Sequence, residues 1–154
     1  MAASKNSALA NEFVAFVRGA SGQEILQRIT QLTRSPDFVG RVIFVVSNTF
    51  WKPPGIHMLA YVASKGALIG MARTLAVGLG RDGVAVTAVA PGLTRTPATT
   101  VVPADEFADV EAHQALPRPL TPDDTAAVVA MLAGDDAAAL TGQTLTVDGG
   151  LVLR

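Results

Sequence analysis

Apolar positions along the chain alternate between helical and strand-like spacing. From residue 8 to about residue 34 they recur every three or four positions, which predicts a helical segment that ends before Pro36. Residues 42–46 (VIFVV) form an unbroken apolar run, and residues 84–90 (VAVTAVA) form a second one that only Thr87 interrupts. Both are typical of strands that are buried on both faces of a parallel sheet. Residues 57–80 lie between these runs, are rich in helix formers and small residues, and predict a long helix.

The rest of the chain predicts a long loop, a further helix and a third strand. Residues 97–120 are irregular apart from an acidic, helix-like middle, and loops of this length are often functional lids. Thr121 as N-cap, followed by Pro122 and two acidic residues, predicts a helix that ends near Gly134. Residues 143–147 predict the third strand. Strands separated by helices imply right-handed crossovers, so we expect an α/β fold with a parallel sheet covered on both faces.

Composition narrows the class of protein. The chain has 154 residues, of which 49% are hydrophobic and 16% charged, which excludes an intrinsically disordered chain. A net charge of −1 argues against binding to nucleic acid through the phosphate backbone. The absence of cysteine excludes disulfides and thiolate metal sites and is compatible with the cytoplasm. The two histidines are far apart, so we expect no metal site, and no apolar run is long enough to predict a membrane span or a secretory signal.

The chemically informative block is Tyr61-Val-Ala-Ser-Lys65. Tyr61 is the only tyrosine, and Lys65 four residues later lies on the same helical face. An ammonium group favours the phenolate form of a nearby tyrosine, so the pair could exchange a proton near neutral pH. A bare Y-x-x-x-K pattern is short and is most often structural. Its context adds weight, because Ser47 and the Pro91-Gly92 pair follow predicted strands, at the carboxyl ends where open α/β sheets bind ligands.

Taken together, the motifs resemble the classical short-chain dehydrogenase/reductase family over about residues 40–150. The matching segments are GRVIFVVS (40–47), AYVASKGALIGMARTLAVGLG (60–80), VAVTAVAPGLTRT (84–96) and LTGQTLTVDGG (140–150). Their order and spacing also agree with the family. The resemblance implies a truncated, Rossmann-like, doubly wound parallel sheet of about three strands with flanking helices. It also implies hydride transfer with NAD or NADP, either to reduce a carbonyl or to oxidise a secondary alcohol.

The resemblance implies a role for each matching residue. Tyr61 would be the general acid in reduction and the base in oxidation, while Lys65 would assist it and hydrogen-bond the nicotinamide ribose. Ser47 would polarise the substrate carbonyl. The cofactor-binding residues would be Tyr61, Lys65, Pro91, Gly92, Thr94 and Thr96, the two threonines holding the nicotinamide carboxamide. Residues 97–118 would form the substrate lid.

Two assignments near the catalytic serine stay open. Ser47 lies fourteen positions before Tyr61, whereas the more usual family spacing is thirteen, which would place Asn48 in the role of the serine. An extra residue in the loop that follows would restore Ser47, and we favour it. An asparagine amide could also donate to a carbonyl. The single tryptophan, Trp51, either lines the substrate pocket or packs in the loop.

The sequence departs from the family before residue 40. We find no glycine-rich phosphate-binding turn, no residue that selects NAD or NADP, and no Asn-Asn-Ala-Gly stretch. We interpret residues 8–34 as the helix that precedes the strand of Ser47, which places Gly19 where the family has a catalytic asparagine. Alternatively, residues 14–22 correspond to the first strand and glycine turn. Either interpretation predicts weak or no binding of NAD or NADP.

We therefore expect one partial domain and keep two functions open. Its parts are a helical segment (1–39), a catalytic strand-helix-strand unit (40–96), the lid (97–120) and a C-terminal helix and strand (121–154). The favoured function is an NAD(P)-dependent oxidoreductase acting on a small carbonyl or alcohol, without the N-terminal phosphate-binding half. The alternative is a non-catalytic remnant that serves as an interaction or oligomerisation module. Either way we expect a homo-oligomer or pairing with a full-length relative, with no nucleic acid and no membrane as partner.

Overall fold

A parallel sheet forms the centre of the computed structural model, which describes residues 40–153. The strands β1 (Gly40–Val45), β2 (Val84–Pro91) and β3 (Thr144–Val147) lie in the order β1-β2-β3. Gly40 pairs with Val84 and Ala88 pairs with Thr144, and both strand pairs are parallel. The helix expected at residues 8–34 lies outside the described residues.

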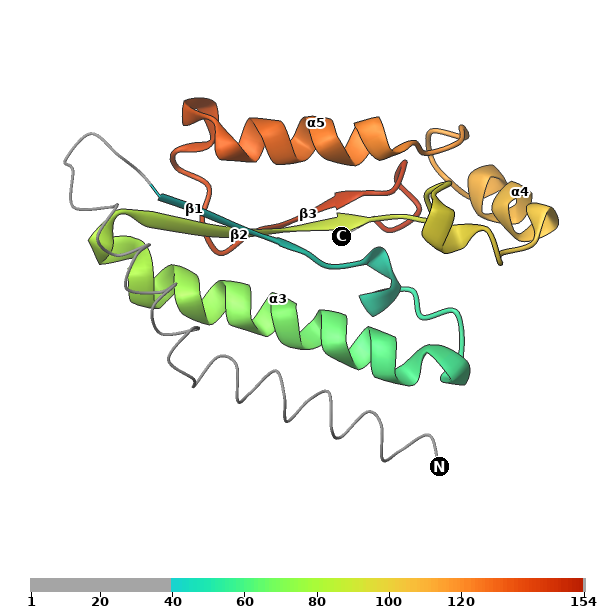
Figure 1. Ribbon diagram of the computed structural model, residues 1–154, viewed down its shortest axis with the longest axis horizontal. Coiled ribbons are helices and arrows are strands. Elements are labelled where there is room, and N and C mark those ends of the chain that lie inside the picture. The colour runs from blue at the N-terminus through green and yellow to red at the C-terminus, as the bar shows by residue number, and fades with distance from the viewer. Residues whose placement is uncertain (1–39, 154) are drawn as a thin grey trace.

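Helices cover both faces of this sheet (Figure 1). Helix α3 (Leu59–Leu79) lies on one face and α5 (Pro122–Ala133) on the other, while α4 (Ala104–Ala112) lies beyond the arrowheads of the strands. Short 3-10 helices occur at Asn48–Phe50, Ile56–Met58, Gly80–Asp82, Pro97–Thr99 and Asp135–Ala137. This arrangement confirms the predicted α/β fold with a doubly wound parallel sheet. The three strands begin or end within two residues of their predicted limits.

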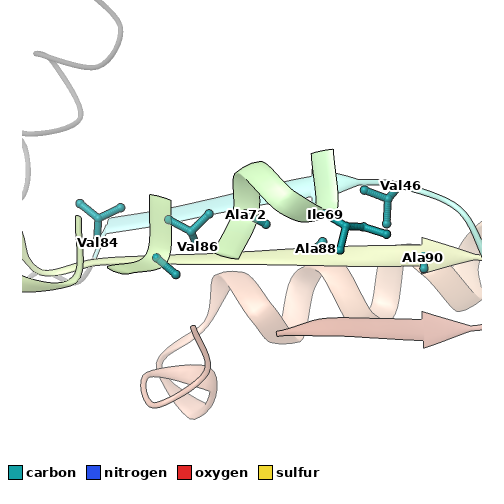
Figure 2. Close-up of a cluster of buried hydrophobic side chains, with 8 residues drawn as sticks. Val46, Ile69, Ala72, Val84, Val86, Ala88 and Ala90 are labelled. Atoms are coloured by element: carbon teal, nitrogen blue, oxygen red, sulfur yellow. The ribbon is translucent and has the colours of Figure 1, made fainter. Parts of the chain in front are cut away.

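Strand β2 is the centre of the core because it has a neighbour on each edge and a helix on each face. Its residues from Val84 to Ala90 are all buried. Successive side chains point to opposite faces. Those that face α3 form one cluster with Ile69 and Ala72 of that helix (Figure 2). The cluster consists of Val46, Ile69, Ala72, Ala76, Val84, Val86, Ala88 and Ala90.

The second cluster lies between the sheet and α5. Val89 of β2 is completely buried, and Leu132 of α5 is 1% exposed. Ala137, in the turn after α5, completes the buried set. The two clusters hold the two helices on opposite faces of the same strand.

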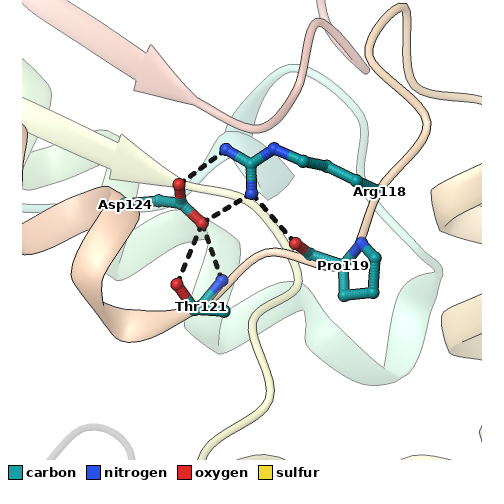
Figure 3. A network of polar contacts seen from close by, with 4 residues as sticks. All are labelled: Arg118, Pro119, Thr121 and Asp124. Atoms are coloured by element: carbon teal, nitrogen blue, oxygen red, sulfur yellow. Dashed lines mark hydrogen bonds and ion pairs between the residues drawn. The ribbon is translucent and has the colours of Figure 1, made fainter.

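Helix α5 begins as its sequence predicts. Thr121 is the N-cap, and its backbone N–H donates to Asp124 Oδ2 at 2.8 Å. The Arg118 guanidinium donates two hydrogen bonds to the same carboxylate, of 2.6 Å to Oδ1 and 3.0 Å to Oδ2. It also donates to the Pro119 carbonyl (Figure 3). The guanidinium of Arg118, together with the Thr121 N–H, lowers the pKa of the Asp124 carboxyl well below its ordinary value.

One helical stretch among the described residues, Ile56–Asp82, is long and apolar enough to cross a membrane by composition alone. A core helix of a soluble fold passes the same test. Ile69, Ala72 and Ala76 of this stretch are buried against the sheet. A single stretch of this kind is weak evidence and no firm sign of a membrane protein.

Truncating the apolar anchor of α5 tests the second cluster. Leu132→Ala leaves a cavity between α5 and β2, and we expect it to lower the free energy of unfolding by about 2–5 kcal/mol. The neighbouring Met131 is 44% exposed, so Met131→Ala is the matched control and is expected to change stability by less than about 1 kcal/mol. Urea unfolding followed by circular dichroism measures both. Equal effects of the two variants would contradict this account of the core.

The pH dependence of stability tests the Arg118–Asp124 pair. Because folding lowers the pKa of Asp124, the pair stabilises the fold above the unfolded pKa of about 4 and loses this effect as the pH falls below it. We expect Asp124→Asn to lower the melting temperature at neutral pH and to flatten its fall below about pH 4. Asp123→Asn, in the same exposed turn, is expected to keep the wild-type profile. Parallel profiles for Asp124→Asn and wild type would show that the ion pair contributes nothing.

Candidate active site

The predicted site residues lie at one edge of the sheet, where the three parallel strands end. The start of α3, with Tyr61 and Lys65, lies at this edge, and α4, in the segment predicted to be the lid, lies beyond it (Figure 1). Ser47 follows β1, Pro91 ends β2, and Asp148 follows β3 directly. In open α/β sheets this edge is the usual place of ligand binding.

Lys65 connects α3 to the end of β1. Its ammonium Nζ donates to the Val45 carbonyl at 3.1 Å and lies 5.4 Å from the centre of the Tyr61 ring. The Tyr61 side chain lies in the first turn of α3, and the residue is 40% exposed. Within residues 40–153 its hydroxyl has no hydrogen-bond partner. The structure therefore brings the predicted pair together and leaves the phenol open to a ligand.

Ser47 and Asn48 occupy different environments, although both are buried. Ser47 is the N-cap of the turn Asn48–Phe50, and its Oγ accepts hydrogen bonds from the N–H (3.3 Å) and the hydroxyl (3.0 Å) of Thr49. Within the described part of the chain the Ser47 hydroxyl donates to no other group. The Asn48 amide instead donates to Asp148 Oδ2 at 3.1 Å. The Asn48 amide is thus engaged within the fold, while the proton of Ser47 stays available.

The loop after Ser47 packs against α3 through an aromatic pair. Phe50 lies on Gly66, the residue after Lys65, where a Cβ would come within 2.6 Å of the ring. Trp51 meets Phe50 edge to face with ring centres 5.2 Å apart, and it also packs against the buried α3 cluster. Of the two interpretations left open for Trp51, the structure shows the packing contact.

The turn after β2 is held by its own threonines. The Thr94 hydroxyl donates to the Gly92 carbonyl at 3.0 Å. Thr99 donates its hydroxyl to the Thr94 carbonyl at 2.7 Å and accepts the Thr96 N–H at 2.9 Å. Sequence reasoning missed Thr99, although a T-x-x-T spacing at the start of a short helix is a capping signal. The turn is preorganised, and its threonine hydroxyls already bond within the chain.

Gly92 itself lies where strand β3 ends. Its N–H donates to the Val147 carbonyl at 2.9 Å. A Cβ on Gly92 would come within 2.8 Å of the Asp148 Cβ and 2.9 Å of Leu120 Cδ1. Only a glycine lets the two chain segments approach this closely.

The segment predicted to be the lid contains a buried aromatic anchor that the sequence analysis did not identify. Phe107 of α4 is 5% exposed, and the Arg95 guanidinium lies 4.2 Å from the centre of its ring. Arg95 also forms an ion pair with Glu111 at 3.3 Å. An aromatic residue in an otherwise acidic helix was the available signal. A hollow of about 200 Å³ lies here, lined by Arg95, Thr96, Thr99, Thr100, Val102, Ala104 and Phe107.

Comparison with known proteins identifies the family. A family model described as enoyl-(acyl carrier protein) reductase matches residues 24–152. Dehydrogenase/reductase SDR family member 4 of Caenorhabditis elegans is 38% identical over 122 residues, which are 75% of this chain and 46% of that protein. Glucose 1-dehydrogenase of Gluconobacter oxydans is 39% identical over 113 residues, covering 72% of this chain and 42% of that protein. The chain belongs to the short-chain dehydrogenase/reductase family.

A solved structure of the family shows the same fold. A short-chain dehydrogenase of Burkholderia cenocepacia in complex with NADP superposes with a TM-score of 0.66 and 35% identity over 73% of this chain and 45% of that one. This result confirms the predicted family and the Rossmann-like sheet. The chain spans less than half the length of these three relatives. Because the relatives are named as dehydrogenases or reductases, the comparisons do not favour the alternative of a non-catalytic module.

Two glycine substitutions test the close approach at the strand ends. Gly92→Ala is expected to lower the free energy of unfolding by about 1–3 kcal/mol, since the added methyl overlaps the backbone of Asp148. Gly70→Ala is the matched control, because nothing lies within 4 Å of a Cβ at that exposed helical position. There we expect stabilisation by roughly 0.5–1 kcal/mol. Urea titrations that give both variants the same sign would contradict the crowding at Gly92.

Proposed function

We propose that this chain carries the catalytic residues of an NAD(P)-dependent oxidoreductase that reduces a carbonyl or oxidises a secondary alcohol. The observation that carries the proposal is the hydrogen bond of Lys65 to the Val45 carbonyl. This bond holds the start of α3, and with it Tyr61, beside the strand end that leads to Ser47. Three groups able to donate a proton thus lie near one sheet edge in a chain of this oxidoreductase family.

Each of the three residues then has one task. The Tyr61 hydroxyl gives its proton to the carbonyl oxygen during reduction and takes it back during oxidation. The Lys65 ammonium, 5.4 Å from the centre of the Tyr61 ring, stabilises the phenolate that remains. The Ser47 hydroxyl polarises the same carbonyl. We favour Ser47 over Asn48 for this task, because the Asn48 amide already donates to Asp148, whereas the Ser47 hydroxyl proton has no acceptor within residues 40–153.

The described residues fit the nicotinamide end of the cofactor. Lys65 bonds the Val45 carbonyl with one of its three N–H groups, so two remain to bind ribose hydroxyls. We assign the carboxamide to the turn of Pro91, Gly92, Thr94 and Thr96. The Gly92 and Thr94 carbonyls each accept one hydrogen bond from a threonine hydroxyl and keep a second lone pair for it. The cofactor, when bound, supplies the hydride that reduces the carbonyl carbon. Because the sequence lacks a glycine-rich phosphate turn, we expect binding roughly a thousandfold weaker than a complete site gives.

The partners follow from the same proposal. The substrate is a small carbonyl or alcohol compound beneath the lid. Helix α3 leaves apolar side chains exposed, such as Leu59 at 64% and Val77 at 84%, which favours a homo-oligomer or pairing with a full-length relative. We also propose a cytoplasmic location, because a chain without cysteine is compatible with a reducing compartment.

Titration of NADH and NADPH into the 154-residue chain, followed by turnover with a panel of small ketones and aldehydes, tests the proposal. We expect weak binding that Lys65→Ala weakens further, and slow turnover that Tyr61→Phe abolishes, because the phenyl ring has no proton to give. Arg73→Ala removes a cation from the same helix two turns later and is expected to leave both unchanged.

The outcomes separate the parts of the proposal. Equal turnover by wild type and Tyr61→Phe would overturn the role of the tyrosine. Micromolar binding that Lys65→Ala weakens would mean that the chain, or a second copy, supplies a phosphate site, and the weak-binding expectation would be wrong. No binding and no turnover at millimolar cofactor would overturn the catalytic proposal and make the interaction module the leading hypothesis.

A further inference from the structure

A buried carboxylate at the end of β3 connects two parts of the site. Asp148 is 2% exposed and accepts three hydrogen bonds of 3.1 Å. Its Oδ1 accepts the Gly150 N–H, and its Oδ2 accepts the Val152 N–H and the Asn48 amide. The first two bonds shape the turn after β3. The third reaches across 100 residues of sequence to the loop after β1.

The loop after β1 is organised around Asn48. The Asn48 carbonyl accepts the N–H groups of Trp51 at 3.0 Å and of Lys52 at 3.2 Å, which closes the turn. Ser47 precedes Asn48 and takes its own hydrogen bonds from Thr49 inside the same turn. The hydrogen bond of the Asn48 side chain to Asp148 therefore connects this turn to the end of β3. A contact that fixes the Asn48 side chain also fixes the backbone of Ser47, because the two residues are adjacent in the same turn.

The turn after β3 is joined to the base of the lid as well. The Leu116 N–H donates to the Gly149 carbonyl at 2.8 Å. Gly149 has φ +64°, and a Cβ there would lie 3.1 Å from the Leu116 carbonyl and closer still to the Gln114 side chain. Residues 148–150 thus contact the Ser47 loop on one side and the end of the lid on the other.

We propose that Asp148 is a positioning residue, which holds the Ser47 loop in register with the base of the lid through the Asn48 amide. The inference rests on the proposed role of Ser47. Breaking the contact leaves a buried carboxylate oxygen and a buried amide without one of their partners, which is costly, so the loop stays with the turn after β3. A serine that must donate to a carbonyl needs this fixed position, because a small displacement of a catalytic group costs much of its effect.

Three variants of the full chain test this inference. Asn48→Ala removes the hydrogen bond between residues 48 and 148 but leaves the hydrogen bonds of Asp148 with the N–H groups of Gly150 and Val152. Asp148→Asn leaves one acceptor oxygen for three donors. The double variant Asn48→Asp/Asp148→Asn exchanges donor and acceptor between these two positions. It restores their contact but not the hydrogen bond of the Val152 N–H, so it is compared with Asp148→Asn, which lacks both. Asp136→Asn, an exposed aspartate outside the site, is the control.

The readouts are the emission of Trp51, which is the only tryptophan, and the steady-state constants. Trp51 lies three residues after Asn48 in the same turn, so its emission reports the loop without cofactor. We expect a red shift and stronger quenching by acrylamide in both single variants, and a signal nearer to wild type in the double variant. We expect kcat to fall about tenfold or more in Asn48→Ala with KM little changed, since Ser47 acts on the reacting carbonyl.

The two proposals fail in distinguishable ways. An inactive wild-type chain would overturn the catalytic proposal, and the Trp51 signals would still decide whether Asp148 holds the loop. Wild-type emission in Asn48→Ala, or a double variant no closer to wild type than Asp148→Asn, would overturn the inference. Turnover that depends on Tyr61 but is unaffected by Asn48→Ala would overturn it too.

Discussion

Parallel pairing around β2 is the constraint on which the rest of the structure depends. The register of β1 with β2 and of β2 with β3 makes all three strands end at one edge. Ser47, Pro91 and Asp148 come from distant parts of the sequence and meet there only because of that register. A shift of one residue would turn every β2 side chain to the opposite face and disrupt the packing of both buried clusters.

The two faces of β2 pack against different helices near the site. Val84, Val86 and Ala88 point toward α3, whereas Val89 points toward α5. The side chains that face α3 fix the helix that carries Tyr61 and Lys65. The opposite face fixes α5, whose first turn is locked by Arg118 at the end of the lid. Helix α3 and helix α5 are therefore held from opposite sides of one strand.

Local signals in the sequence predicted the elements well. The start of α5 follows from Thr121, Pro122 and the acidic residues after them, because capping depends only on near neighbours. The strands followed from their apolar runs, but burial on both faces holds only for β2. In β1, where one edge has no neighbour among the described strands, Val45 is 52% exposed. The hydrogen bond between Asn48 and Asp148 could not be predicted in this way, since neither residue belongs to a periodic pattern and the partners are 100 positions apart. The cation over Phe107 was equally out of reach, because it depends on how the lid folds back.

The polar groups at the strand ends fall into two sets with different roles. The first set forms hydrogen bonds within the chain and keeps the backbone in place, and it consists of Asn48, Asp148 and Thr99. In contrast, among residues 40–153 the hydroxyl protons of Tyr61 and Ser47 have no acceptor within the chain. A fold that satisfies the neighbouring groups so fully leaves few donors to a ligand. Those that remain can transfer a proton to a carbonyl or polarise it. This division, more than any single contact, supports assigning the chemistry to Tyr61 and Ser47 and the geometry to Asn48 and Asp148.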